Sequence, residues 1–402
     1  MTSTKTGSGE AIGARTKRAA GAGAGEGDPL RLIDVDHVRF YVGNAKQAAY
    51  FYAQCFGFQI EQYSDLTTGS REDASYLITQ GNIRLLLTTG LRPDHPAQLE
   101  VVQYGDGIKD IAFAVDDAAA TYEQALRNGA QSAYEPTEIS DEIGTITRAG
   151  IKAMGRVVHS FVSRKGEYAL EKVKKGGTFA PHFARVEGLA LNDYNKKNPC
   201  GLYYVDHCVA NVELGKMNEW VRWYEETLGF KLFKHFDDAD ISTAYSALMS
   251  KVMDSGRELI KIPINEPAEG KRKSQIQEYL DWHDNTPGIQ HLALLTDNAI
   301  DSVGALHNRG VDFLTIPDVY YDLVWDQVGE IREDKEKIKD LRILVDRDDE
   351  GYLLQIFTKP LQDRPTLFFE IICRRGSRSF GKGNFKTLFE SLEIEQEKRG
   401  NL

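Results

Sequence analysis

The chain has few cysteines, and their spacing suits neither a disulfide framework nor a structural zinc site. Only Cys55, Cys200, Cys208 and Cys373 occur in 402 residues, and none belongs to a CxxC pair. Disulfide-rich secreted domains and structural zinc sites need more cysteines at closer spacing. We therefore expect a cytoplasmic protein that is stabilised by an apolar core.

Long apolar runs and basic patches are also missing. No stretch approaches the roughly 18 consecutive apolar residues of a membrane span, and the N-terminus lacks the apolar centre of a secretory signal. The formal net charge is −11, and lysine and arginine form no long patch. Because nucleic acids are bound through dense positive charge, we expect neither nucleic acid nor a membrane as a partner, and we favour a small molecule.

After a short tail, the chain repeats itself. Residues 1–28 are rich in Gly, Ala, Thr and Ser and are predicted to be disordered. The segment VDHVRFYV from Val35 corresponds to VDHCVANV from Val205, and GIKDIAFAV from Gly107 corresponds to GIQHLALLT from Gly288. Each segment reads as a strand that continues into an amphipathic helix and ends at a glycine.

The repeating unit is one strand, one helix and about three further strands, and it occurs four times. Alternating segments such as SYLITQGNIRLLLTT suit paired antiparallel strands, and Gly57 and Gly229 suit the left-handed residue that ends a helix. We predict an α+β fold of four βαβββ modules that form two open β-barrel domains with helices outside. The predicted divisions are a tail over 1–28, an N-terminal domain over 29–175, a linker over 176–200 and a C-terminal domain over 201–402.

The two halves differ at residues that can bind a metal. His37 and His207 are equivalent, whereas His291 is matched by Asp110. For Glu370, within LFFEII, the nearest counterpart in the first half is the segment KGEYALEKV. Because a shared fold does not explain residues present in only one copy, we expect the C-terminal half to carry the function.

His207, His291 and Glu370 each lie on a predicted strand with apolar neighbours. Two imidazoles and one carboxylate on one side of a metal leave coordination positions open, as in non-haem Fe(II) oxygenases. A structural reading is also open, because a strand histidine is more often a hydrogen-bonded core residue and Glu370 can pair with Arg374 or Arg375.

Four segments resemble the 4-hydroxyphenylpyruvate dioxygenase family of the vicinal oxygen chelate superfamily. They are IPINEPAEGKRKSQIQEYL (262–280), GIQHLAL (288–294), LLQIFTKPLQDRPTLFFEII (353–372) and FGKGNFKTLFESLEIEQ (380–396). The N-terminal half is similar in DHVRFYVGNAKQAAYFY and GDGIKDIAF, so the resemblance covers nearly everything after the tail. It implies two vicinal oxygen chelate domains, of which the first lacks a metal site and the second is catalytic.

The resemblance implies that His207, His291 and Glu370 bind Fe(II). The implied reaction converts 4-hydroxyphenylpyruvate and O2 to homogentisate and CO2, a step of tyrosine breakdown. Three protein ligands on an octahedral ion leave about three positions, two for the keto acid and one for O2. The residues implied around the substrate are Gln275, Gln290, Gln355 and Phe357 at the catalytic centre and Ser250, Asn265, Phe368, Phe380, Asn384 and Phe385 along the pocket.

The implied pocket residues also have local support. Gln355 lies two residues from Phe357 in an apolar strand, which places both on one face. Phenylalanines can sandwich a substrate ring and exclude water, although ordinary core packing explains them too. The family's C-terminal helix closes the site, and Gly381 and Gly383 can form its hinge, but a static packed helix fits the same pattern.

Three other functions compete with this interpretation. A 4-hydroxymandelate synthase shares fold, triad and substrate but hydroxylates the benzylic carbon, and an extradiol catechol dioxygenase uses a similar triad on a catechol. The segment PIN (263–265) and Phe357 favour the homogentisate-forming type. A non-catalytic aromatic-binding member of the superfamily would lack an iron ligand, whereas all three are present. We also expect a homo-oligomer, either a dimer or a tetramer.

Overall fold

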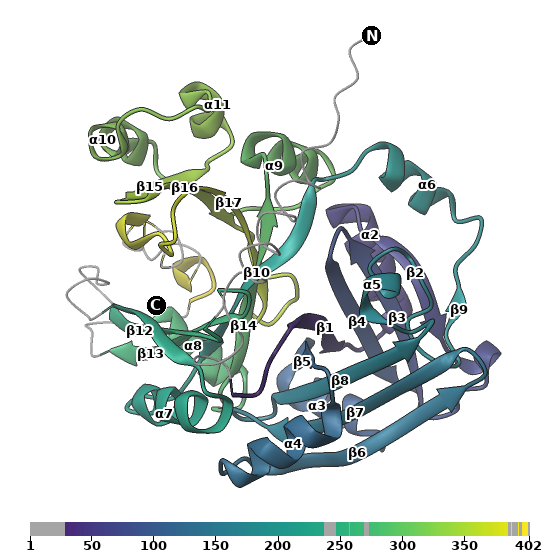
Figure 1. Cartoon of the computed structure of the whole chain (residues 1–402). Coiled ribbons are helices and arrows are strands. Elements are labelled where there is room, and N and C mark those ends of the chain that lie inside the picture. The colour runs from purple at the N-terminus through teal and green to yellow at the C-terminus, as the bar shows by residue number, and fades with distance from the viewer. Residues whose placement is uncertain are drawn as a thin grey trace.

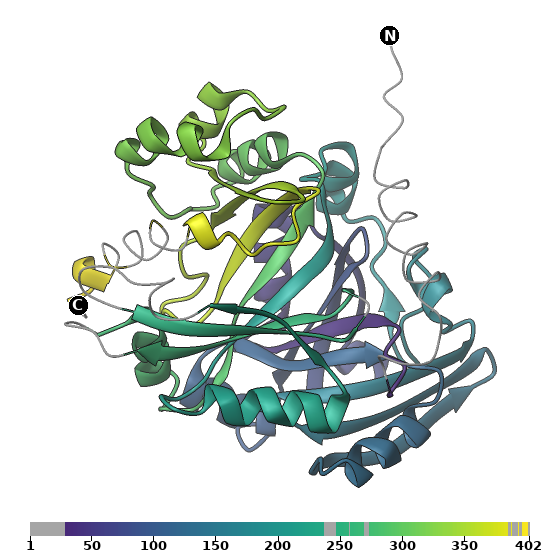
Figure 2. The same cartoon turned by 60° about the vertical axis from the view of Figure 1, so that its left-hand side comes forward.

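The computed structural model describes residues 29–236, 247–256, 258–268, 273–384, 387, 393 and 396–400. The predicted tail, Phe385 and most of the predicted C-terminal helix lie outside the described residues. The described chain forms two curled sheets with helices around them (Figures 1 and 2).

The first sheet has nine strands in the order β6-β7-β8-β5-β1-β4-β3-β2-β9. These strands are β1 (Asp34–Tyr41), β2 (Gln59–Ser64), β3 (Asp73–Gln80), β4 (Ile83–Gly90), β5 (Gly107–Ala114), β6 (Ser132–Asp141), β7 (Gly144–Lys152), β8 (Val158–Gly166) and β9 (Ala184–Arg185). The helices of this half and of the connection after it are α2 (Ala45–Phe56), α3 (Pro96–Tyr104), α4 (Ala118–Arg127), α5 (Leu170–Val173) and α6 (Ala190–Lys197).

The second sheet has eight strands in the order β11-β12-β13-β10-β14-β17-β16-β15. These strands are β10 (Leu202–Asn211), β11 (Lys231–Phe236), β12 (Ala247–Asp254), β13 (Lys261–Ala268), β14 (Gly288–Thr296), β15 (Leu344–Asp348), β16 (Gly351–Phe357) and β17 (Phe368–Arg375). The helices are α7 (Met217–Leu228), α8 (Gln275–Trp282), α9 (Ala299–Asn308), α10 (Asp318–Val328) and α11 (Lys335–Asp340).

Read from opposite ends, the two strand orders are the same, apart from the extra edge strand β9. The strands β1, β5, β8 and β7 of the first half correspond to β10, β14, β17 and β16 of the second. Each half consists of two modules with one strand, a helix and three strands, so the prediction of four βαβββ modules is confirmed. Gly57 and Gly229 have φ angles of 75° and 70° and end helices α2 and α7, as predicted.

One predicted correspondence is wrong. The segment KGEYALEKV does not form the strand that matches β17, because β8 ends at Gly166 and residues 170–173 form helix α5. The parallel ladders set the true match: Asp110 is opposite Val158, and His291 is opposite Phe368. Two residues further along, Ser160 therefore occupies the position of Glu370.

The halves share one hydrophobic core. On β17, Phe368 and Glu370 lie on one face, so the alternation of strand side chains turns Phe369 the other way. The Phe369 ring packs on helix α2 of the first half, at centroid distances of 5.7 Å from Tyr52 and 5.2 Å from Phe56. The inner face of each curled sheet is thus left for a site, and the opposite face joins the halves.

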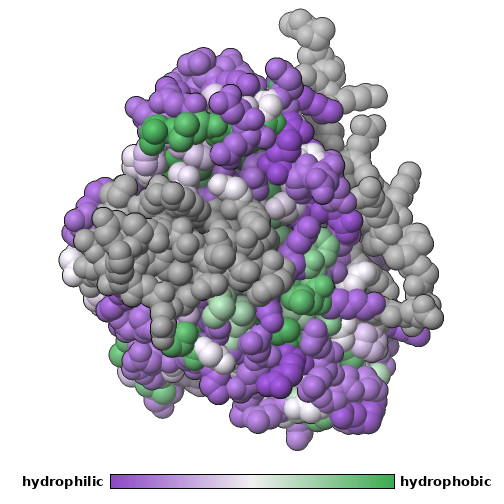
Figure 3. Space-filling view, turned by 90° about the vertical axis from the view of Figure 1, so that its left-hand side faces the viewer, coloured by the Kyte–Doolittle hydropathy of each residue, from purple (hydrophilic) through white to green (hydrophobic). Residues whose placement is uncertain are grey.

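Residues 176–200 also contact the first half, since β9 pairs with β2 and Asn195 of α6 donates hydrogen bonds to backbone carbonyls of Ala53 and Phe58. Figure 3 shows a face that is mostly hydrophilic across the described residues and carries separate hydrophobic areas. Among the described residues, no helix combines the length and the apolar character needed to cross a membrane.

Candidate metal centre

Three neighbouring central strands bring two histidines and one glutamate together. His207 lies on β10, His291 on β14 and Glu370 on β17, and all three are buried. One ligand atom from each lies within 4.8 Å of the others. His207 and Glu370 are both opposite Ala293 of the strand between them, and this small residue leaves space for the longer side chains to meet.

The contacts among the three side chains are polar. His207 Nε2 lies 3.1 Å from Glu370 Oε2, and His291 Nε2 lies 3.6 Å from the same oxygen. Both imidazoles therefore face the carboxylate through Nε2. This is a donor set of two nitrogens and one oxygen at a single point inside the second sheet.

The other ring nitrogens have partners that fix the orientation of the rings. His207 Nδ1 lies 3.0 Å from Asp206 Oδ1, and His291 Nδ1 lies 3.3 Å from Gln290 Oε1. Because carboxylate and amide oxygens only accept hydrogen bonds, each Nδ1 carries a hydrogen, so Nε2 is the nitrogen of each ring that can give a lone pair to a cation once its own proton is released. Hydrogen-bonded imidazoles of this kind are typical of metal ligands.

Electrostatics keep the carboxylate ionised. Burial raises the pKa of Glu370, but His207 and His291 outweigh burial and lower it to about 2. Burial lowers the pKa of His207, and Glu370 and Asp206 outweigh that effect and raise it. For His291 burial prevails over Glu370, and its pKa is lowered. The cluster therefore offers one carboxylate to a cation.

Aromatic rings enclose the three side chains. The Phe368 ring stacks on His291 at a centroid distance of 4.6 Å, and Phe357 meets the same imidazole edge-on at 6.0 Å. The Phe380 ring lies 5.0 Å from that of His207. The structure thus brings three of the four predicted phenylalanines to the cluster, and the fourth, Phe385, lies outside the described residues.

Two predicted amides are buried nearby without complete hydrogen bonding. Gln355 is 1% exposed, and neither its Oε1 nor its Nε2 has a partner among the described residues. It shares a face of β16 with Phe357, which is opposite Glu370. Asn384 accepts a hydrogen bond from the Tyr320 hydroxyl at 2.7 Å, while its Nδ2 has no partner among the described residues. Buried amides with free donors and acceptors are suited to a polar ligand.

The remaining predicted residues lie on other elements. Gln290 contacts His291, so its place is beside a ligand histidine. Ser250 of β12 is opposite Asn265 of β13, and Gln275 begins helix α8. No hydrogen bond or ring contact within the described ranges joins Ser250, Asn265 or Gln275 to the three clustered side chains.

The sequence interpretation missed two buried amides, Asn211 and Gln396. Asn211 is opposite Asn265, is fully buried, and has no hydrogen-bond partner for either amide atom among the described residues. The signal that selected Gln355, a polar residue in an apolar strand, was also present at Asn211 in VDHCVAN. Gln396 lies in a helical sequence with no such signal.

Comparisons with known proteins agree with this geometry. Residues 34–147 and 204–356 match the profile of the Glyoxalase/Bleomycin resistance protein/Dioxygenase superfamily. A 4-hydroxyphenylpyruvate dioxygenase of Dictyostelium discoideum is 46% identical over 374 residues, which cover 91% of this chain and 99% of the relative. The enzyme of that name from Danio rerio is 43% identical over 378 residues, which cover 92% and 93%.

Solved structures show the same architecture. A triple mutant of 4-hydroxymandelate synthase from Streptomyces coelicolor superposes with a TM-score of 0.78 at 28% identity, over 91% of this chain and 99% of that one. A xylose isomerase-like TIM barrel/4-hydroxyphenylpyruvate dioxygenase fusion protein gives a TM-score of 0.66 at 18% identity, over 92% of this chain and 53% of that one. The second likeness concerns the fold alone.

Proposed function

Since the chain belongs to the 4-hydroxyphenylpyruvate dioxygenase family of the glyoxalase/bleomycin resistance protein/dioxygenase superfamily, we propose that His207, His291 and Glu370 hold Fe(II). The proposed reaction converts 4-hydroxyphenylpyruvate and O2 to homogentisate and CO2. The observation that carries this proposal is the buried His-His-Glu cluster on three adjacent strands.

The residues present fit a ferrous ion. Two Nε2 lone pairs and one carboxylate form the set that non-haem Fe(II) oxygenases use, and three protein ligands leave about three positions for substrate and O2. When bound, iron would supply a chelation site for the α-keto acid and the redox chemistry for activation of O2 and loss of CO2. The protein supplies the orientation of the ligands, through Asp206 behind His207 and Gln290 behind His291.

The pocket residues orient the substrate and exclude water. We assign the substrate ring to the space bordered by Phe357, Phe368 and Phe380, because these rings already pack against the ligand histidines. The unpartnered amide nitrogens of Gln355 and Asn384 donate hydrogen bonds to oxygen atoms of the substrate without adding charge beside the metal. Ser250, Asn265 and Gln275 are proposed for the more distant part of the pocket.

The alternative products are less well supported. Three 4-hydroxyphenylpyruvate dioxygenases are 44–46% identical to this chain, whereas the 4-hydroxymandelate synthase structure is 28% identical. The extradiol reading has no support beyond its similar triad. A homo-oligomeric state stays a prediction, which sedimentation equilibrium tests.

The test replaces Glu370 with alanine in the full chain and compares it with Glu226→Ala, a change at an exposed glutamate of α7. Loss of a ligand should lower bound iron and reduce substrate-dependent O2 uptake by more than about 100-fold. This exceeds the effect of removing a residue that only hydrogen-bonds to a ligand, which is about 10–100-fold. Mass spectrometry of the product distinguishes homogentisate from 4-hydroxymandelate. Normal iron content and turnover in Glu370→Ala would exclude the ligand assignment.

A further inference from the structure

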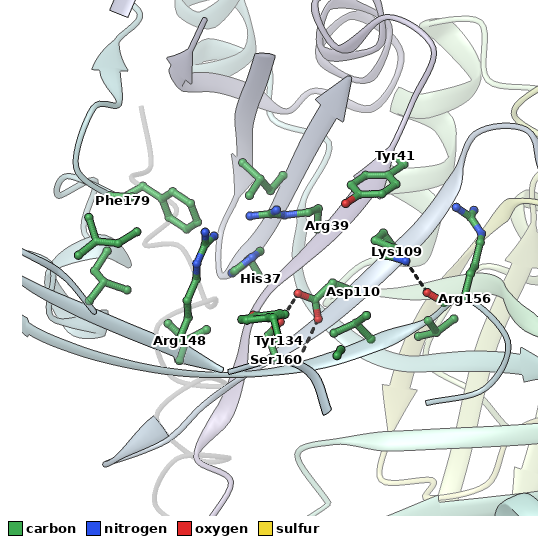
Figure 4. Close-up of a pocket in the computed structure, with 18 of the residues that line it drawn as sticks. His37, Arg39, Tyr41, Lys109, Asp110, Tyr134, Arg148, Arg156, Ser160 and Phe179 are labelled. Carbon is green, nitrogen blue, oxygen red and sulfur yellow. Dashed lines mark hydrogen bonds between the residues drawn. The ribbon is translucent and has the colours of Figure 1, made fainter. Parts of the chain in front are cut away.

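The first half contains a cavity of about 570 Å³ on the inner face of its sheet (Figure 4). The equivalent strands place it where the second half has its metal centre. His37, Asp110 and Ser160 line the cavity and occupy the positions of His207, His291 and Glu370. This volume is within the range of small-molecule sites, which is about 300–1,000 Å³.

The three equivalent side chains do not form a metal-binding set. Ser160 replaces the glutamate, and its backbone N–H donates to Asp110 Oδ1 at 3.0 Å while its hydroxyl bonds Asp110 Oδ2. The Tyr134 hydroxyl lies 2.6 Å from Ser160 Oγ. The carboxylate of Asp110 is thus hydrogen-bonded inside the protein, and only His37 keeps the residue type of its counterpart in the second half.

The cavity contains two arginines at positions where the second half has uncharged residues. The ladders place Arg39 at the position of Val209, opposite Asp110, and Arg148 at the position of Gln355. Figure 4 shows their side chains extending toward one another from β1 and β7. Arg148 replaces the very residue that we assign to substrate binding in the second half.

These two guanidinium groups have no close charged partner, although the charges of Asp110 and Asp73 act on Arg148 from a longer distance. Arg39 and Arg148 form no ion pair within the described part of the chain, and the Nε of each has no hydrogen-bond partner there. Burial lowers the pKa of Arg148, and the charge of Arg39 lowers it further. Placing two repelling cations together costs stability, which favours a role in binding an anion.

The other buried or half-buried cations of the cavity have partners, while Lys152, which also lines it, is exposed to solvent. Lys109 and Arg156 both pair with Glu100, at 2.7 and 3.0 Å. Arg164 pairs with Asp36, at 2.7 Å. The excess positive charge is therefore concentrated at Arg39 and Arg148, in a chain whose formal net charge is −11.

His37 adds a hydrogen-bond acceptor. Its Nδ1 lies 2.7 Å from Asp36 Oδ1, so Nδ1 carries the hydrogen and Nε2 has the lone pair. His37 is only 6% exposed, and its Nε2 has no partner among the described residues. The side chains of His37 and Arg39 are two residues apart on one strand, about 6–7 Å along it, which is close to the length of a substituted benzene ring.

Aromatic rings provide the walls. The Phe179 ring meets the His37 ring edge-on at a centroid distance of 5.3 Å, and Arg148 lies 6.0 Å from the centre of the Tyr134 ring. We propose that this cavity is a second ligand site, separate from the metal centre, that binds a small hydroxylated aromatic carboxylate. Arg39 and Arg148 bind the carboxylate, Phe179 and Tyr134 contact the ring, and His37 Nε2 accepts the hydroxyl hydrogen.

The test titrates 4-hydroxybenzoate into the iron-loaded full chain by calorimetry. The variant Arg39→Gln/Arg148→Gln is compared with Arg92→Gln/Arg127→Gln, which removes the same charge from two exposed positions of the same half. Because the probe can also enter the metal centre, the difference between the two variants isolates the cavity. We expect the first variant to lose one binding site per chain and the control to keep it.

A second variant covers the case in which the double substitution does not fold. Arg148→Gln alone should weaken binding at the cavity by at least about tenfold, since a hydrogen bond to a charged group contributes about 1.5–3 kcal/mol. Equal binding by Arg148→Gln and Arg92→Gln would overturn the proposal. Inorganic phosphate that displaces 4-hydroxybenzoate at equal concentration would overturn the aromatic class and leave a general oxyanion site.

Discussion

Asp206 and Asp36 have the same contacts in the two halves, and this separates what the fold requires from what the metal requires. Asp206 contacts His207 and pairs with Arg374 at 2.7 Å; Asp36 contacts His37 and pairs with Arg164. The buried Asp-His-Arg cluster is therefore part of both halves. The metal centre depends on what differs, namely histidine and glutamate in one half against aspartate and serine in the other.

Asp206→Asn tests this distinction, with Asp36→Asn as its control. Each change removes a buried carboxylate from its arginine and should cost about 3–5 kcal/mol of unfolding free energy. Only Asp206→Asn should also weaken iron binding, by about 10–100-fold, because it alone supports a ligand histidine. Iron affinity is measured by competition with a chelator. An equal loss of affinity in both variants would contradict the assignment.

Gly381 is required by the side chain of Gln355. Gly381 has a φ angle of 80°, and a Cβ built on it would lie 2.2 Å from Gln355 Nε2. Alanine at this position must therefore displace the amide that we assign to the substrate, as well as strain the backbone. Gly381→Ala should raise KM for 4-hydroxyphenylpyruvate about tenfold or more. A hydrogen bond lost between Gln355 and the substrate costs about 1.4 kcal/mol, which corresponds to a tenfold change in affinity.

The control for this change is Gly304→Ala in α9, where an added Cβ has open space. The steady-state KM of this variant should match the wild type. A Gly381→Ala enzyme with an unchanged KM would mean that Gln355 does not contact the substrate.

At the level of elements, helices and most strands could be predicted because their signals are local. Hydrophobic periodicity and the glycines at 57 and 229 define helices α2 and α7. The match of Glu370 to KGEYALEKV failed because a parallel ladder joins strands that are far apart in sequence. The register of such a ladder cannot be deduced from the sequence of either strand alone. Asn211 carries the local signal of a polar residue in an apolar strand, but its pairing with Asn265 on another strand could not be predicted.

An ion pair joins the C-terminal segment to helix α8. Arg399 donates to both oxygens of Glu278, at 3.1 and 2.7 Å, and Glu278 is 4% exposed. Arg399→Gln removes a charge partner from a buried carboxylate, which costs about 1–3 kcal/mol of unfolding free energy. Hydrogen–deuterium exchange of peptides that cover residues 393–400 should therefore become about 5–100-fold faster.

Glu397→Gln is the matched control, because Glu397 is exposed two residues earlier in the same segment. Exchange in this variant should equal that of the wild type. If Arg399→Gln exchanged at the wild-type rate, the ion pair would not hold the segment.

At the level of the whole molecule, the repeat reveals four modules but not how the halves join. Tyr52 and Phe56 of helix α2 contact Phe369, a residue of strand β17 whose neighbours Phe368 and Glu370 face the metal centre. The sequence shows such residues only as apolar. Their partners follow from the arrangement of the two sheets, which no local pattern contains.

Two buried histidines lie where the halves meet, and they make this contact sensitive to pH. His159 of β8 is fully buried, and its Nε2 lies 2.8 Å from the hydroxyl of Tyr224 on α7. His283, just after α8, packs its ring 4.9 Å from that of Tyr104 on α3. Burial lowers the pKa of His159 to about 4, and burial together with Arg156 lowers that of His283 to about 4.

The direction of the pH effect follows from these values. The unfolded chain has a histidine pKa of about 6.5, so between pH 6.5 and 4 the unfolded state binds more protons than the folded state. The stability that each histidine contributes by being buried in its neutral form is therefore fully present above pH 6.5. It is lost as the pH falls toward 4. Each histidine should remove about 2 kcal/mol of unfolding free energy between pH 7 and pH 5.

Urea unfolding at pH 7 and pH 5 measures this loss. His159→Gln and His283→Gln cannot take up a proton, so each variant should lose about 2 kcal/mol less than the wild type over this range. His307→Gln, at an exposed histidine of α9, should lose as much as the wild type. Because all variants share every other titrating group, the difference belongs to the interface histidine. If His159→Gln lost as much unfolding free energy as the wild type, protonation of His159 would not be what destabilises the contact between the halves.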